Sequence, residues 1–230
     1  MTTKFSINPL LPLRNAGFSL VELSITLVII AFIVGAATSG MIIKHNLELQ
    51  DIMGDISTLT QATNEFNTMY GGLPGDLWNA TEKFGVSNTV NGNGNGLIDT
   101  PDEQLLAFQH LSLAGLIKGD YPSTWAIESL MRGSIPNSTF YFDILEDATA
   151  ITFTAIGSEQ ASRIAILSPD DMYSLDKKYD DAMPNTGTIR AFTGDEAVAC
   201  TEGDDATSGY NMTNENPACY FTISIRSAFQ

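Results

Sequence analysis

The longest apolar segment of the chain lies close to its N-terminus. From Leu23 to Ile43 no charged residue occurs. At a helical rise of about 1.5 Å per residue, a segment of this length covers roughly the 30 Å hydrocarbon core of a bilayer. We therefore expect a membrane-spanning helix in this part of the chain.

A helical repeat continues beyond the apolar segment. Mostly apolar side chains recur at alternating spacings of four and three, at Ile52, Ile56, Leu59, Thr63, Phe66 and Tyr70. Such a stripe predicts a helix with one face packed on a core. The helix should end at residues 71–76, where glycine and proline gather. Gly35, Gly40 and Gly54 are poor helix formers, so a bent or locally melted helix and a straight one both fit the sequence.

The rest of the chain combines helix and strand patterns. A helix is predicted from Pro101 to Lys118, because Thr100 can cap it, Glu103 completes a capping box and Gly119 follows it. Segments rich in β-branched and aromatic residues predict strands at 139–142, 150–154, 163–166, 188–192 and 220–225. The predicted fold class is α+β, with a long N-terminal helix followed by a mainly antiparallel sheet.

The first 21 residues of the chain carry charged side chains of positive sign alone. Lys4 and Arg14 occur there without any acidic residue, so this short leader should stay in the cytoplasm while the bulk of the chain crosses the membrane. An ordinary secretory signal has the same basic start and would be cleaved behind the apolar segment, near residues 35–37. Glu22 distinguishes the two, because a carboxylate at mid-bilayer costs about 3 kcal/mol and calls for a partner.

The segment from Gly17 to Leu23, Gly-Phe-Ser-Leu-Val-Glu-Leu, resembles the signature of type IV prepilins and type II secretion pseudopilins. This resemblance implies that a prepilin peptidase cleaves after Gly17 and that Phe18 becomes the N-methylated mature N-terminus. It also implies that Glu22 meets the N-terminal amine of a neighbouring subunit in a filament. Pairing of this kind lowers the cost of burying both charges and sets the register of assembly.

The same resemblance implies an organisation in three parts and a structural role. Residues 1–17 are the leader, residues 18–70 form the transmembrane and filament-core helix, and residues 71–230 form an exported α+β head. The partners are other pilin subunits, the prepilin peptidase and an inner-membrane assembly platform. A type IV pilus is the favoured filament, and a type II secretion pseudopilus is the near alternative. The subunit starts in the inner membrane with its head in the periplasm and ends in a pilus or pseudopilus.

Two cysteines lie near the C-terminus, Cys200 and Cys219, without metal-binding spacing. We expect a disulfide between them if this region reaches an oxidising compartment, and two free thiols if it does not. Acidic residues crowd this region, at Asp195, Glu196, Glu202, Asp204 and Asp205, and are typical of a solvated loop. In pilins the region bounded by cysteines is an exposed surface that contacts other subunits.

A polar glycine-rich segment has the ligand spacing of a calcium loop. Oxygen-bearing side chains stand at Asn91, Asn93, Asn95, Asp99 and Asp102, with a glycine at the sixth position. Three of these ligands are neutral amides, so calcium affinity would be weak. The alternative interpretation is an Asn-Gly turn before a capped helix, with the acidic residues serving the helix N-terminus.

Charge and composition disfavour two other classes of function. With 27 acidic against 11 basic side chains and a formal net charge of -16, the lone head should not bind nucleic acid. The only histidines are His45 and His110, no catalytic motif is present, and acidic pairs such as Asp180-Asp181 are typical of a solvated acidic surface. We therefore expect no enzyme. A secreted enzyme behind an ordinary signal peptide, and an adhesin or DNA-uptake receptor on a pilin stem, are the alternatives from other classes.

Overall fold

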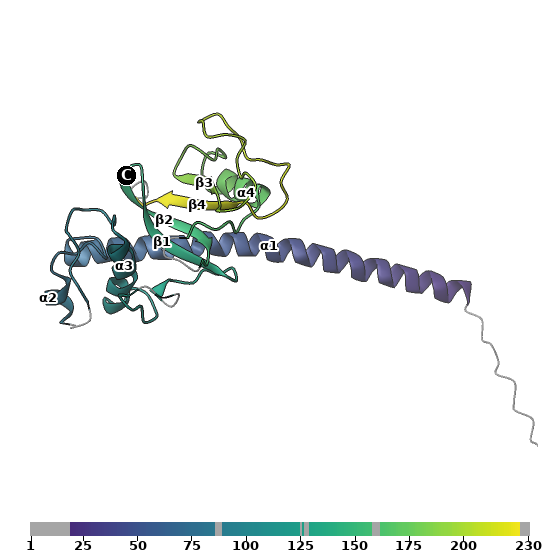
Figure 1. Cartoon of the computed structure of the whole chain (residues 1–230). Coiled ribbons are helices and arrows are strands. Elements are labelled where there is room, and N and C mark those ends of the chain that lie inside the picture. The colour runs from purple at the N-terminus through teal and green to yellow at the C-terminus, as the bar shows by residue number, and fades with distance from the viewer. Residues whose placement is uncertain (1–18, 86–88, 125, 127–128, 158–161, 226–230) are drawn as a thin grey trace, which may run out of the picture. The chain divides into compact units, whose positions relative to one another are not determined.

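A computed structural model describes residues 19–85, 89–124, 126, 129–157 and 162–225. Its helices are α1 (Leu20–Tyr70), α2 (Ala80–Phe84), α3 (Pro101–Leu113) and α4 (Pro169–Tyr179), and its strands are β1 (Ser138–Leu145), β2 (Ala148–Ala155), β3 (Ile189–Thr193) and β4 (Cys219–Ser224) (Figure 1). The chain divides into two compact units, Met1–His45 and Asn46–Gln230. The α+β fold class predicted from the sequence is confirmed.

Helix α1 is continuous from Leu20 to Tyr70, so the three interior glycines do not interrupt its hydrogen bonding. Ser19 starts it, because its Oγ accepts a hydrogen bond from the Val21 N–H at 3.3 Å and its carbonyl accepts one from the Leu23 N–H at 3.0 Å. The helix ends where predicted, at Gly71, whose φ of +73° lies in the left-handed region. Glycine adopts this conformation without a Cβ penalty, which makes it the usual helix stop.

The head, Asn46–Gln230, is built on a four-stranded antiparallel sheet in the order β1-β2-β4-β3. The strand register aligns apolar side chains into rows across the sheet. Phe140, Phe153, Phe221 and Ala191 form one row, and Phe142, Ile151, Ile223 and Ile189 form the next. Because side chains alternate between the two faces of a strand, both rows lie on the same face.

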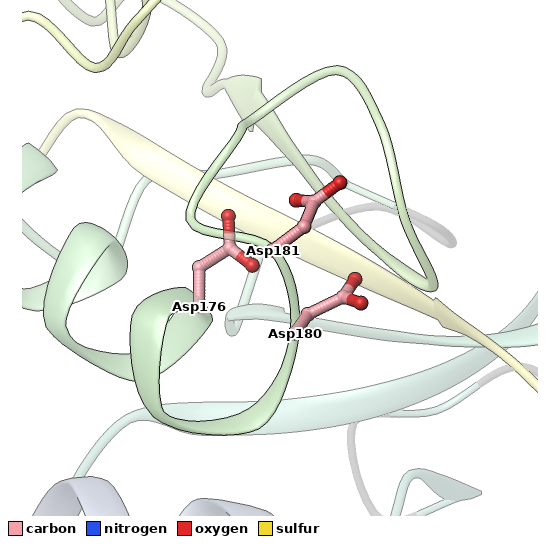
Figure 2. Close-up of side chains that lie close together, drawn as sticks. All are labelled: Asp176, Asp180 and Asp181. Carbon is pink, nitrogen blue, oxygen red and sulfur yellow. The ribbon is translucent and has the colours of Figure 1, made fainter.

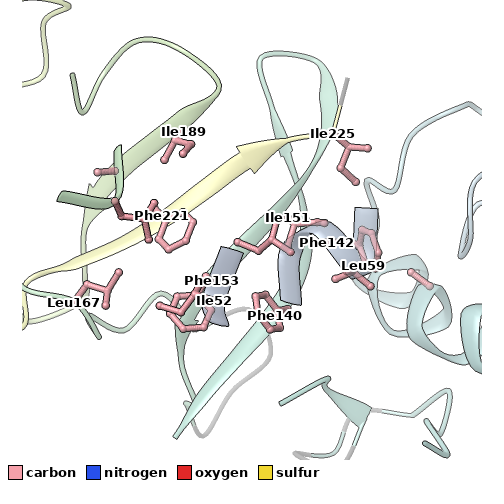
Figure 3. Close-up of a cluster of buried hydrophobic side chains, with 14 of the residues drawn as sticks. Ile52, Leu59, Phe140, Phe142, Ile151, Phe153, Leu167, Ile189, Phe221 and Ile225 are labelled. Atoms are coloured by element: carbon pink, nitrogen blue, oxygen red, sulfur yellow. The ribbon is translucent and has the colours of Figure 1, made fainter. Parts of the chain in front are cut away.

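The apolar stripe of α1 packs on this face and forms the core of the head. Ile52, Leu59 and Phe66 are fully buried, and they belong to the same cluster as the phenylalanines of β1, β2 and β4. Figure 3 shows Ile52 and Leu59 beside these rings. Phe153 lies between Phe140 and Phe221, with ring centroids 5.2 and 5.5 Å away. The stripe predicted from spacing alone is therefore confirmed.

Two predicted elements differ from the structure. Helix α3 ends at Leu113, before the predicted Lys118, because Gly115 at φ +73° turns the chain earlier than Gly119 does. The predicted strand at 163–166 is wrong, since this segment forms no continuous ladder with the sheet. Ile164 makes an isolated bridge with Ala155, and the Ile166 N–H donates to the Cys219 carbonyl at 2.9 Å.

Helix α4 was not predicted, although the sequence contains its start signals. Ser168 accepts a hydrogen bond from the Asp171 N–H, the Asp171 carboxylate accepts one from the Ser168 N–H, and Pro169 takes the first helical position. This is a capping box with aspartate at the third position. The helix buries Met172 and Leu175 in the core. Helix α2, with 5 residues, is too short to show a periodic pattern.

Candidate functional site

The first candidate site is the start of α1. Residues Leu20–Ala37 form the one described helix segment that is long and apolar enough to cross a membrane, with a mean hydropathy of 2.5 and none of it buried within the chain. Glu22 lies exposed in the first turn. Gly17 and Phe18, the predicted cleavage residues, lie outside the described residues.

The hydroxyl groups of Ser24, Thr26 and Ser39, in this part of α1, are satisfied by the helix itself. Ser24 donates to the Val21 carbonyl at 2.8 Å, Thr26 to the Leu23 carbonyl at 2.8 Å, and Ser39 to the Gly35 carbonyl at 3.0 Å. Such bonds matter in lipid, where no water replaces a missing partner. The segment therefore presents apolar surface with one charged exception, Glu22.

The second candidate site is the Asn-Gly loop, and the structure brings together only part of the predicted calcium ligands. Asp99 accepts hydrogen bonds from the side-chain amides of Asn93, at 3.3 Å, and Asn95, at 2.8 Å. The bond from Asn95 is the main cause that lowers the pKa of Asp99. Asn91 lies elsewhere, because its Oδ1 accepts from the Thr81 N–H at the start of α2. Asp102 is exposed in the first turn of α3.

Two acidic residues outside the predicted ligand set organise this loop. The buried Asp76 carboxylate accepts hydrogen bonds from the backbone N–H groups of Gly94, Asn95 and Gly96, at 2.6, 3.0 and 2.8 Å. Glu103, which also completes the α3 capping box, accepts the Asn93 N–H at 2.9 Å. The backbone N–H groups of this loop therefore point inward at the carboxylates of Asp76 and Glu103.

Glycine makes this arrangement possible. Gly94 and Gly96 have φ values of +74° and +87°, which lets consecutive N–H groups converge on one carboxylate as an anion-binding nest. A Cβ on Gly92 would lie 2.2 Å from the Gly75 carbonyl oxygen. The alternating glycines therefore allow the close backbone contact at Gly75 and the hydrogen bonds to the Asp76 carboxylate. Calcium binding by the loop stays a prediction.

Replacement of Asp76 by alanine should open this loop. The backbone N–H groups of Gly94, Asn95 and Gly96 would lose the charged acceptor that holds them, and we expect a loss of about 3 kcal/mol in the free energy of unfolding. Hydrogen exchange at the Gly94, Asn95 and Gly96 amides and thermal unfolding measure both effects. Asp102→Ala, which removes an exposed acid from the first turn of α3, is the matched control and should cost less than about 1 kcal/mol. Equal losses in the two variants would contradict this role for Asp76.

The histidines occupy different environments. His45 is exposed on α1, whereas His110 is fully buried on α3. Nδ1 of His110 accepts the Gly75 N–H at 2.9 Å, so Nε2 carries the proton and donates to Thr89 Oγ1 at 3.1 Å. Burial lowers the pKa of His110 to about 4. This neutral imidazole joins α3 to the turn after α1 and acts as a structural group.

The predicted disulfide between Cys200 and Cys219 is present, and both cysteines are fully buried. Cys219 is the first residue of β4, where it pairs with Thr193 of β3. The bridge therefore closes the loop that leads from β3 back to the sheet. The acidic residues near it, Asp195, Glu196, Glu202, Asp204 and Asp205, are exposed, as predicted for a solvated loop.

The comparisons with known proteins identify the N-terminal segment. Residues 12–38 match the family model described as the prokaryotic N-terminal methylation motif. No curated protein and no solved structure is significantly similar to the chain. The helix that holds most of this motif is long and apolar enough to cross a membrane, which is consistent with a membrane-anchored precursor. The matched motif is the signature of type IV pilins and pseudopilins, and it supports a pilin-like or pseudopilin-like precursor.

Proposed function

We propose that this chain is a structural subunit of a type IV pilus. A prepilin peptidase cleaves it after Gly17, Phe18 is N-methylated, and the mature subunits assemble through α1. The single observation that carries the proposal is the position of Glu22, which lies in the first turn of an exposed apolar helix and inside the matched methylation motif.

The exposed surface of α1 supports assembly through this helix. Leu20, Val28 and Phe32 are 85, 70 and 79% exposed in the single chain. A continuous apolar surface of this kind needs a cover, because water contact costs about 25 cal/mol per Å². Lipid covers it in the membrane, and neighbouring helices cover it in a filament.

The charge of Glu22 supports a defined register. Cleavage after Gly17 creates an α-amino cation on Phe18, in the same apolar layer as the Glu22 carboxylate. A buried charge is stabilised only when it is paired, so the amine of one subunit and the carboxylate of its neighbour favour one axial offset over others. The presence of this acid fits a subunit that enters the body of a filament.

Two features support a periplasmic location of the head. The basic residues Lys4 and Arg14 favour a leader on the cytoplasmic side of the inner membrane, with the head in the periplasm. The Cys200–Cys219 disulfide favours an oxidising compartment for the head. Both agree with a periplasmic precursor that is later displayed on the cell surface.

Processing is tested by mass spectrometry of the N-terminal peptide. We expect protein coexpressed with a prepilin peptidase to begin at N-methylated Phe18, and Gly17→Ala to retain the leader, because the prepilin signature has glycine immediately before the cut. Gly35→Ala, which alters the site of an ordinary signal peptide, is the matched control and should be processed normally. A mature N-terminus near residue 38 would reject the proposal.

The choice between a pilus and a type II secretion pseudopilus needs a cellular readout. Electron microscopy of a strain that lacks this chain should show loss or shortening of surface filaments, while the secretion of exoproteins continues. Lost secretion with unchanged surface filaments would assign the chain to a pseudopilus.

A further inference from the structure

Residues 91–96 consist of three consecutive Asn-Gly pairs. Their asparagines, Asn91, Asn93 and Asn95, are exposed to water. A glycine has no Cβ to keep its backbone nitrogen away from the side chain of the preceding asparagine, so that nitrogen can attack the asparagine Cγ. The loop therefore contains three asparagines whose local sequence favours spontaneous deamidation.

Deamidation of an Asn-Gly pair passes through a cyclic imide. The glycine nitrogen loses its proton to solvent and forms a bond to the asparagine Cγ, the Cγ–Nδ2 bond breaks, and the leaving nitrogen takes up a proton and departs as ammonia. Water then adds to one of the two imide carbonyls and opens the ring, which leaves aspartate or isoaspartate. Water is the only co-reactant. The reaction does require a glycine nitrogen that is free to lose its proton and an asparagine side chain that is free to turn onto it.

The Asp76 carboxylate holds the attacking nitrogens of two of these pairs. The Gly94 N–H donates to Oδ1 of Asp76 at 2.6 Å, and the Gly96 N–H donates to Oδ2 at 2.8 Å. Asp76 is buried, which strengthens both hydrogen bonds. A negative charge at this distance also opposes the loss of a proton from either N–H, because the resulting nitrogen anion would face a like charge. Asp76 therefore disfavours the first step of the reaction by position and by charge.

The Asp99 carboxylate holds the reacting side chains of the same two pairs. Nδ2 of Asn93 donates to Oδ1 of Asp99 at 3.3 Å, and Nδ2 of Asn95 donates to Oδ2 at 2.8 Å. The oxygens of the two amides are bound as well, because Oδ1 of Asn93 accepts from the Asn95 N–H and Oδ1 of Asn95 accepts from the Leu97 N–H, each at 2.9 Å. Rotation of either side chain onto the glycine nitrogen breaks these bonds.

The first Asn-Gly pair provides an internal comparison, because it has different partners. The Gly92 N–H donates to the Leu77 carbonyl at 3.0 Å. Oδ1 of Asn91 accepts from the Thr81 N–H at 2.9 Å. The same chemistry at residues 91–92 is therefore controlled by groups other than the Asp76 and Asp99 carboxylates.

We propose that Asn93 and Asn95 form a latent deamidation site, which Asp76 and Asp99 keep slow by holding the glycine nitrogens and the asparagine side chains apart. A carboxylate in place of either amide would lose its hydrogen bond to Asp99 and repel that residue. Isoaspartate would also lengthen the backbone beside Gly94 and Gly96, whose left-handed φ values of +74° and +87° shape the loop. Modification of one pair would therefore open the loop and expose the other pair to reaction. This proposal is independent of the role in a filament.

Peptide mapping by mass spectrometry tests the proposal on the full chain in detergent at mildly alkaline pH, with EDTA to exclude protection by a bound cation. Wild-type Asn93 and Asn95 should be converted far more slowly than in a synthetic peptide of residues 89–99, where no fold holds the loop. Asp76→Ala should accelerate conversion at both asparagines by roughly tenfold or more, since a hydrogen bond to a charged acceptor contributes about this factor to a local opening equilibrium. Conversion at Asn91 should stay close to its wild-type rate.

A second variant tests the exposed carboxylate and leaves the buried one in place. Asp99→Ala should accelerate conversion at Asn93 and Asn95 several-fold, whereas the matched control Asp102→Ala, which removes an exposed acid from α3, should keep wild-type rates. Equal acceleration at all three asparagines in both Asp76→Ala and Asp99→Ala would indicate general unfolding and would overturn the proposal. Two other results would also overturn it: a wild type that reacts as fast as the peptide, and wild-type rates in both of these variants.

Discussion

Glu22→Gln is expected to leave leader cleavage intact and to abolish filament assembly. Glutamine keeps the size and shape of the side chain, but it removes the charge and replaces one accepting oxygen with an NH2 donor. The amine on Phe18 of a neighbouring subunit would then be buried without a partner. Breaking one side of a buried ion pair costs about 3–5 kcal/mol, which lowers the equilibrium constant for adding each subunit by a hundredfold or more. Immunoblots of leader cleavage and the yield of sheared surface filaments measure the two steps separately.

The matched control for this variant is Glu65→Gln. Glu65 lies on the same helix but on an exposed part of its head segment, so the same chemical change there should leave the filament yield unaltered. A wild-type filament yield from Glu22→Gln would show that this charge does not direct assembly. Loss of cleavage in Glu22→Gln would instead place the residue in peptidase recognition.

Replacement of both Cys200 and Cys219 by serine should cause the largest loss of stability in the head. The bridge joins residues 19 apart in sequence, and closing a loop of this length stabilises the folded state by about 3 kcal/mol through the entropy of the unfolded chain. For a chain of this size the loss corresponds to a fall in Tm of roughly 10 °C. Circular dichroism of the full chain during heating measures this change.

Reduction of the wild type is the matched control for the cysteine variant. Dithiothreitol should lower the Tm of the wild type to that of the double variant, and it should leave the double variant unchanged. Loss of the disulfide should also destabilise β3. Cys219 pairs with Thr193 of that strand, and the Cys200 N–H donates to Thr193 Oγ1 at 3.0 Å. An unchanged Tm on complete reduction would show that the packing of the loop, without the covalent bond, holds it in place.

The elements with regular spacing were predictable because each depends on local pattern. The α1 stripe from Ile52 to Phe66, the capping box of α3 at Thr100 and Glu103, and the four strands of the sheet follow from periodicity and from side-chain types. The capping box at Ser168 and Asp171 carries the same kind of start signal for α4, with aspartate in place of the usual glutamate or glutamine at the third position. The end of α3 was misplaced because two glycines, Gly115 and Gly119, could each have stopped it, and only packing selects the first.

The acidic sites were much harder to predict, because acids with different roles look alike in a sequence. Asp76 and Asp102 both lie near glycine-rich turns, yet Asp76 is buried under three backbone donors while Asp102 is exposed. Asp180 and Asp181 look like a solvated pair until Asp176, one helical turn earlier, is seen to be buried beside them (Figure 2).

The sequence by itself indicated a pilin-like or pseudopilin-like class for this protein. The spacing of Gly17, Phe18 and Glu22 before an uncharged apolar segment is a linear signal, because the motif lies within residues 12–38 and the capacity to span a membrane depends on hydrophobic length. Only the tertiary structure decided which carboxylates meet one another and which backbone donors they satisfy. Those pairings join residues far apart in the chain, such as Asp176 with Tyr210 and Asp76 with Gly94, and they depend on how the helices pack against the sheet.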